Sequence, residues 1–88
     1  MFEKGQVVYS AAGHDQGSFY VVVAVEESGF CRIADGRRRK LAAPKQKNQK
    51  HLRPTRMRVE LETIGSDRAL RGALAALCHT EPAEGPRE

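Results

Sequence analysis

The sequence predicts a small, mostly β domain: a short barrel followed by one or two short helices. Three observations lead to this prediction. The chain has 88 residues, enough for one small domain with a thin core. Its first half consists of short β-prone runs with turn signals every 8–12 residues. Its last third changes to helical spacing, so we expect a barrel over residues 1–55, a helical extension over 56–80 and a disordered tail over 81–88.

The first two strands lie on either side of a loop. Residues 6–10 form a short β-prone run, and residues 13–17 form a loop with glycine at both ends. Residues 19–26 are the strongest strand because they are rich in aromatic and β-branched side chains. Their continuous apolar run predicts burial on both faces, as in a strand that bends across a small barrel. Residues 27–29 then turn the chain.

The third strand is predicted over residues 30–34, with Cys31 and Ile33 on one face. The Asp35-Gly36 pair that follows predicts a type I′ hairpin turn, in which both central residues need a positive φ. The return strand would then cover residues 37–41, with residues 37–40 at the hairpin tip and its descending strand. We expect residues 45–50 to be an exposed loop, and residues 51–52 to form a short closing strand.

The last third predicts one or two helices. Met57, Leu61 and Ile64 fit a helical stripe, although a strand fits residues 59 and 61 equally well. Gly65 would end that helix as a left-handed residue, and Ser66 would cap the next one. An apolar stripe along this second helix should pack on the barrel, on the side away from the basic hairpin; it consists of Leu70, Ala73, Leu74 and Leu77.

The charges are distributed unevenly. The chain has 15 lysines and arginines and 11 acids. Ten of the cations lie between residues 36 and 58, a stretch that contains no acid. This asymmetry is expected of a surface that meets a polyanion, whereas a merely solvated face mixes both signs.

Several segments together resemble the KOW motif: residues 5–8, the loop at 13–17 and residues 20–23. The likeness continues through residues 33–36, the basic residues after them and the lysine-rich loop ending in His51-Leu52, and so covers about residues 3–55. The chain is thereby similar to small bacterial KOW-domain RNA-binding proteins, which resemble KOW proteins of the archaeal and eukaryotic large ribosomal subunit. Ser18 departs from the pattern, because the family usually carries a lysine or arginine there.

The resemblance implies an SH3-like barrel and a non-enzymatic, cytoplasmic, RNA-binding protein of translation or ribosome assembly. The partners would be structured RNA, with ribosomal RNA as the expected target, and the ribosome or its proteins. The free form would be a monomer, and no cofactor is expected. The expected RNA contacts are Arg37, Arg38, Arg39, Lys40, Lys45, Lys47, Lys50, His51 and Arg53. The expected structural positions of the motif are Gly5, Gly13, Asp15, Gly17, Asp35 and Gly36.

A protein-interaction module is the alternative, since KOW domains of elongation factors can act in that way. An exposed apolar surface on the helix would favour a protein partner, and an apolar face docked on the barrel would favour RNA. The aromatic residues mostly fall in apolar patterns typical of a core. Tyr9 is the most plausible exception because it ends the first strand beside the glycine-bounded loop.

Catalytic, metal and membrane functions find little support. Apart from the adjacent Cys78-His79 pair, the histidines and cysteines show no ligand spacing. Asp15 is better explained by a bond to its own backbone than by acid catalysis, and a cleft for a nucleophile is not expected at this size. Residues 37–40 also mimic a nuclear-localisation tetrapeptide, but in a hairpin rather than a disordered segment. We expect no leader and no membrane span, and two buried thiols rather than a disulfide.

Overall fold

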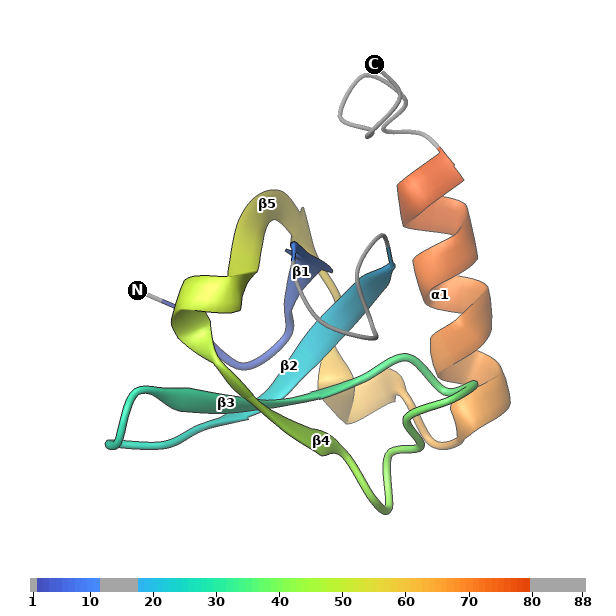
Figure 1. Ribbon diagram of the computed structural model, residues 1–88. Coiled ribbons are helices and arrows are strands. Elements are labelled where there is room, and N and C mark those ends of the chain that lie inside the picture. The colour runs from blue at the N-terminus through green and yellow to red at the C-terminus, as the bar shows by residue number, and fades with distance from the viewer. Residues whose placement is uncertain (1, 12–17, 80–88) are drawn as a thin grey trace.

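The computed structural model describes residues 2–11 and 18–79, without the side chains of residues 78 and 79. Five antiparallel strands form one sheet, and one C-terminal helix lies beside it (Figure 1). The strands are β1 (Gln6–Ser10), β2 (Phe19–Val25), β3 (Phe30–Ala34), β4 (Lys45–Asn48) and β5 (Leu52–Arg58). The helices are the 3-10 turns η1 (Gln49–His51) and η2 (Leu61–Thr63) and the α-helix α1 (Asp67–His79). In the described part of the chain, no helix has the length and apolar character that crossing a membrane requires.

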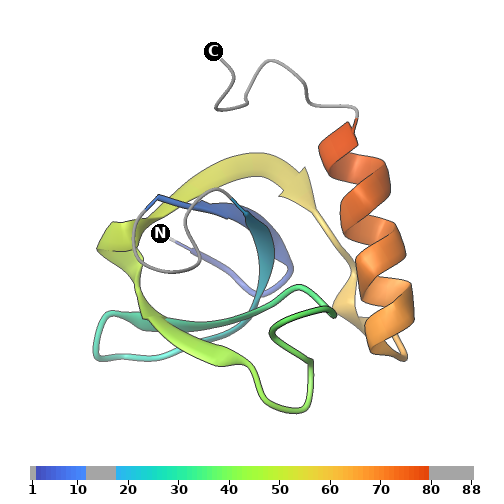
Figure 2. The same cartoon turned by 45° about the vertical axis from the view of Figure 1, so that its right-hand side comes forward.

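The sheet is buried on both faces. Its strand order is β4-β3-β2-β1-β5, and it curls strongly around one of its faces, while α1 lies against the other (Figure 2). Alternate residues of each strand point to opposite faces, so neighbours such as Val7 and Val8 enter different cores, and both are fully buried. The core inside the curl consists of Val8, Tyr20, Val22, Cys31, Ile33 and Leu52. The core under α1 consists of Val7, Val21, Ala34, Val59, Leu70 and Leu74. The predicted burial of the second strand on both faces is confirmed.

The curl is accompanied by two register shifts. One lies between Val22 and Ala24, where β2 pairs with β3. The other lies where β1 pairs with β5, and there the Thr55 hydroxyl bridges the two strands. Its Oγ1 donates to the Val7 carbonyl at 2.7 Å and accepts from the Met57 N–H at 3.1 Å. Bulges of this kind bend a strand, which allows a short sheet to wrap around its own core.

The sheet is not closed. Within the described residues, β4 pairs only with β3 and β5 only with β1. The three residues of η1 connect these two edge strands directly. Pro54 is compatible with β5 because an edge strand leaves half of its backbone groups outside the ladder.

The predicted Asp35-Gly36 hairpin is wrong. Gly36 has a φ of +79°, but Asp35 does not have a positive φ, so the pair cannot form a type I′ turn. Residues 37–41 form no strand, and β4 returns along β3 instead, with Ile33 opposite Lys45 and Phe30 opposite Asn48. The expectation that residues 45–50 are an exposed loop is therefore also wrong.

The region after the closing strand differs from prediction in part. β5 continues to Arg58, so the helical stripe predicted from Met57 to Ile64 is absent apart from η2. Gly65 does not have the positive φ expected of it. The cap at Ser66 is confirmed, because its Oγ accepts from the Ala69 N–H at 3.1 Å. The packing of the α1 stripe on the sheet is confirmed as well.

Candidate nucleic-acid interface

A row of side chains crosses one end of the sheet. Tyr9, near the end of β1, is paired with Phe19 of β2 on one side and with Arg53 of β5 on the other. Cross-strand partners point to the same face, so these three side chains lie in line on the face that α1 covers further along. The two rings meet edge to face, with centroids 5.2 Å apart and planes at 60°. Both rings are half-buried, whereas Arg53 is exposed.

The loop after β3 lies next to this row of side chains. The Asp35 carboxylate accepts from the backbone N–H groups of Arg37 at 2.8 Å and Arg39 at 2.9 Å. The N–H groups of Asp35 and Gly36 in turn donate to the Arg39 carbonyl. These four hydrogen bonds close residues 35–39 into a compact loop, and Arg37 and Arg38 are exposed on its outside. The pairing of Val21 with Ala34 places this loop beside Phe19.

The same loop is fixed to α1. An Arg71 Nη donates to the Gly36 carbonyl at 2.9 Å, and the Leu41 N–H donates to the Asp67 carboxylate at 2.7 Å. Gly36 lies so close that a Cβ on it would be 2.4 Å from the Asp67 carbonyl oxygen. In Figures 1 and 2 the loop reaches the N-terminal end of α1. The expectation that the helix lies away from the basic segment is therefore wrong.

A hollow of about 320 Å³ lies between the loop, the start of β2 and α1. Its lining consists of Ser18, Phe19, Asp35, Arg37, Arg38, Arg71, Leu74 and Ala75. Apolar groups come from Phe19 and from Leu74 and Ala75 of α1, and positive charge comes from three arginines. Asp35 is the acid of the lining, and its carboxylate already accepts two N–H groups of its own loop.

The predicted lysine contacts in β4 and η1 do not gather at this end of the sheet, whereas His51 lies near it. Lys45 and Lys47 belong to β4, and Lys47 is only 8% exposed, because its strand folds back over the core inside the curl. Lys50 is exposed in η1, which is held to the far end of β3 by a bond from the Gln49 N–H to the Gly29 carbonyl. His51 is half-buried, and its carbonyl accepts from the Ala11 N–H at 2.9 Å. The basic stretch of the sequence is thus divided between different parts of the surface.

Several cations have no acidic partner in the part of the chain that the structure describes. Within residues 2–11 and 18–79, no acidic side chain pairs with those of Arg37, Arg38, Lys40, Lys50, Arg53 or Arg56. Arg58, by contrast, pairs with Glu3. Arg39 is half-buried inside its loop. The exposed positive charge near the Tyr9–Phe19 pair therefore comes from Arg37, Arg38, Arg53 and the Arg71 of the hollow, with Lys40 just beyond the loop.

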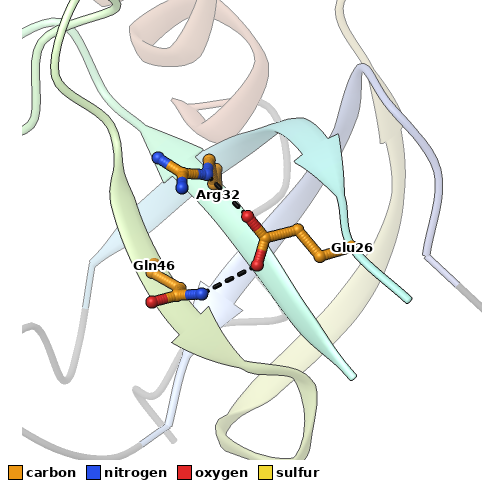
Figure 3. Close-up of polar contacts among 3 residues, drawn as sticks. All are labelled: Glu26, Arg32 and Gln46. Carbon is orange, nitrogen blue, oxygen red and sulfur yellow. Dashed lines mark hydrogen bonds and ion pairs between the residues drawn. The ribbon is translucent and has the colours of Figure 1, made fainter. Parts of the chain in front are cut away.

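Arg32 does not belong to the interface but to a separate polar cluster with Glu26 and Gln46, shown in Figure 3. The Glu26 carboxylate accepts from Arg32 Nε and from Gln46 Nε2, both at 2.7 Å. The bond from Arg32, and next the bond from Gln46, lowers the pKa of Glu26 below its ordinary value of 4.5. The sequence prediction missed this cluster because it placed Gln46 in a loop, where it could not face Arg32.

The backbone at position 5, one of the expected structural positions, requires a glycine. Gly5 has a φ of +88°, and a Cβ there would be 2.6 Å from the Val59 carbonyl oxygen. Its N–H donates to Val22 and its carbonyl accepts from Val59, each at 2.7 Å, so Gly5 joins β2 to the end of β5. Gly13, Asp15 and Gly17, the other motif positions of the loop predicted over residues 13–17, lie outside the described residues.

The thiol and metal chemistry of the described residues is limited. Cys31 is a buried free thiol, and burial, followed by the nearby charge of Glu26, raises its pKa. Among residues 2–11 and 18–79, no group of three or more histidine, cysteine, aspartate or glutamate side chains is placed to hold a metal ion.

Two residues of the interface were not identified from the sequence. Phe19 fitted the pattern of a core aromatic, and Arg71 lay outside the basic stretch. A signal for Arg71 was present, because it is four residues after Asp67 and the two share a helix face.

No family model matches the chain. A search of curated proteins also finds no match.

Proposed function

We propose that this chain is a non-enzymatic RNA-binding protein that contacts structured RNA at the end of the sheet where Tyr9 and Phe19 meet. One observation carries the proposal: exposed guanidinium groups that have no acidic partner among the described residues flank an aromatic pair, Arg53 on one side and Arg37 and Arg38 on the other. A solvated face of mixed charge would need no such arrangement.

The chemistry of these side chains suits a folded RNA. Guanidinium groups bind phosphates in a bidentate manner and also stack on unpaired bases. Half-buried aromatic rings at the same surface provide further stacking area. DNA is less well matched, because α1 uses its apolar face to cover the sheet and its first turns to hold the loop, which leaves it poorly placed to enter a major groove.

We further propose that the sheet is an SH3-like barrel of the KOW type, as the resemblance implies. The order β4-β3-β2-β1-β5 curls around one core, and η1 carries the chain directly from one edge strand to the other. A ribosomal RNA target and a cytoplasmic role in translation or ribosome assembly follow from the same resemblance.

The protein-interaction alternative is less well supported. Leu70 is fully buried and Leu74 is 6% exposed, so the apolar face of α1 is already occupied by the sheet. Of the described residues, Val25 is the only large hydrophobic residue that is exposed. A surface of this kind offers little apolar area to a protein partner.

The test is the salt dependence of RNA binding. The double variant Arg37→Ala, Arg38→Ala removes two exposed charges and leaves the half-buried Arg39 in place. Association should release counterions, with a log–log slope of about −0.7 to −0.9 for each phosphate contacted. The double variant should bind a structured RNA more weakly, and its slope should be shallower by about 1.4 to 1.8 units.

The control is Lys4→Ala, which removes an exposed charge from the N-terminal segment. It should change the affinity and the slope much less. Circular dichroism should show the same fold for all three proteins. If the double variant binds as tightly as the parent and with the same slope, the proposed interface is wrong and the protein-interaction function becomes the better explanation.

A further inference from the structure

We infer that the hollow between α1 and the loop 35–39 receives a single unpaired nucleobase of the bound RNA. This inference rests on the proposed function and adds the feature of the RNA that is recognised. It predicts a preference for RNA with an extruded or bulged base over a fully paired stem.

The lining favours a base over a phosphate. A phosphate would meet the carboxylate of Asp35 as well as the arginines, whereas a neutral base would not be repelled. A carboxylate has more acceptor positions than the two N–H groups that Asp35 already binds, so it can also accept from an exocyclic amino group. Phe19, Leu74 and Ala75 supply the apolar surface that the faces of a base require.

The arginines of the lining match the rest of a nucleotide. Arg37 and Arg38 are exposed at the rim, where they can reach the phosphates on either side of an inserted base. Arg71 is held against the loop by its bond to the Gly36 carbonyl, so its guanidinium group is already positioned before RNA binds. Arginine planes and aromatic rings are the groups on which unstacked RNA bases settle.

The size and rigidity of the hollow agree with this occupant. Its volume of about 320 Å³ lies at the lower end of the range for small-ligand pockets. Three described contacts fix its two walls relative to each other: Arg71 to Gly36, Leu41 to Asp67, and the close approach of Gly36 to Asp67. A preformed pocket loses little conformational entropy on binding, so it can distinguish one extruded base from a stacked pair.

The decisive experiment fills the hollow without changing any charge. Ala75 is exposed on α1 and lines the hollow, so Ala75→Leu adds bulk there. Ala76→Leu is the matched control, because Ala76 is also exposed on α1 but is not part of the lining. The probes are two RNA hairpins of equal length, one fully paired and one with a single bulged 2-aminopurine, whose fluorescence reports on stacking.

The parent and Ala76→Leu should bind the bulged hairpin about tenfold more tightly than the paired one and should change the 2-aminopurine fluorescence. Ala75→Leu should lose both the preference and the fluorescence change, while keeping the affinity for the paired hairpin and the salt slope of the parent. If the parent binds both hairpins equally, or if Ala75→Leu keeps the preference, the base pocket is wrong and the proposed RNA-binding function still stands. If the parent binds neither hairpin in a salt-dependent manner, the proposed function fails and the inference fails with it.

Discussion

At the scale of single residues, Gly5 and Gly29 have similar backbone angles but different surroundings. Their φ values are +88° and +94°, which L side chains rarely adopt. The space where a Cβ of Gly5 would lie is taken by the Val59 carbonyl, whereas a Cβ on Gly29 would have nothing within 4 Å. Comparing alanine substitutions at Gly5 and Gly29 therefore distinguishes the cost of an unfavourable φ from the cost of a steric clash.

We expect Gly29→Ala to lower the free energy of unfolding by about 1 kcal/mol, through the unfavourable φ alone. Gly5→Ala should lower the free energy of unfolding by about 1 to 3 kcal/mol more, because the new Cβ forces Val59 away and disturbs its hydrogen bond to Gly5. Urea denaturation of both variants measures the difference. Equal losses would mean that the Val59 backbone moves away at little cost.

The Glu26 cluster gives a prediction about pH. The partners of Glu26 lower its pKa in the folded protein. The ionised carboxylate therefore stabilises the fold when the pH is above the ordinary pKa of 4.5. That contribution should disappear as the pH falls through the lowered folded-state pKa. Glu26→Gln should therefore be less stable than the parent near pH 6, and the gap should close in the acid range below 4.5.

The measurement is the free energy of unfolding of both proteins from pH 6 to pH 3. Glu27→Gln is the matched control, because Glu27 is an exposed neighbour outside the cluster. Its stability should follow that of the parent throughout. A gap between Glu26→Gln and the parent that stays constant with pH would show that the hydrogen bonds, and not the charge, stabilise the cluster.

At the scale of elements, the loop 35–39 and α1 behave as one unit. The helix covers one face of the sheet through Leu70 and Leu74, and its first turns hold the loop through Asp67 and Arg71. The packing of the helix therefore determines the position of Arg37 and Arg38. A defect in that packing should affect binding as well as stability.

We expect Leu74→Asp to detach α1, since it places a charge in the core under the helix, at a cost of about 2 to 5 kcal/mol. RNA affinity should fall as well, because Leu74 also lines the hollow beside Arg37 and Arg38. Hydrogen exchange of the α1 amides and RNA titration measure the two effects.

Ala76→Asp introduces the same charge at an exposed position of the same helix and serves as the control. It should leave both the exchange protection and the affinity nearly unchanged. Undiminished RNA binding by Leu74→Asp, with α1 detached and the sheet still folded, would exclude α1 from the interface.

At the scale of the whole molecule, the fold divides the basic stretch. Arg53 joins Arg37 and Arg38 at one end of the sheet through the pairing of β5, β1 and β2. Lys50 lies only three positions before Arg53 in the chain, yet it belongs to η1, where the N–H of the preceding Gln49 donates to Gly29 in the β2–β3 turn. The position of a charge in the fold, and not its position in the sequence, should decide its part in binding.

Arg53→Ala and Lys50→Ala test this statement, because each removes one exposed cation from adjacent segments. Arg53→Ala should weaken RNA binding several-fold and make the salt slope shallower by about one unit. Lys50→Ala should change both quantities much less. Equal effects of the two substitutions would mean that the basic stretch attracts RNA as a diffuse charge without a defined site.

Local patterns were sufficient for much of the fold. Alternation and β-branched residues located β1, β2 and β3, and the Ser66 cap with its apolar stripe located α1. These features depend on interactions between residues close together in the chain, which a sequence displays directly. The same holds for the concentration of cations between residues 36 and 58.

The turn after β3 shows where local patterns failed. Asp35-Gly36 is typical of a tight hairpin, but the Asp35 carboxylate binds two N–H groups further along and α1 holds the loop that results. The return strand was therefore misplaced from β4 to residues 37–41. Lysines assigned to a loop were consequently found on a strand, with Lys47 nearly buried.

The sequence by itself thus determined the first three strands, the capped helix and the amount of positive charge. The tertiary structure alone decided which cations lie together. Helix docking places Arg37 and Arg71 around one hollow, and strand register places Arg53 beside Tyr9 at the same end of the sheet. The tertiary structure also decided that Phe19 is part of a surface, because the end of the sheet that α1 leaves open depends on where that helix packs. The physical reason is that such contacts depend on long-range register and packing, which short-range periodicity does not encode.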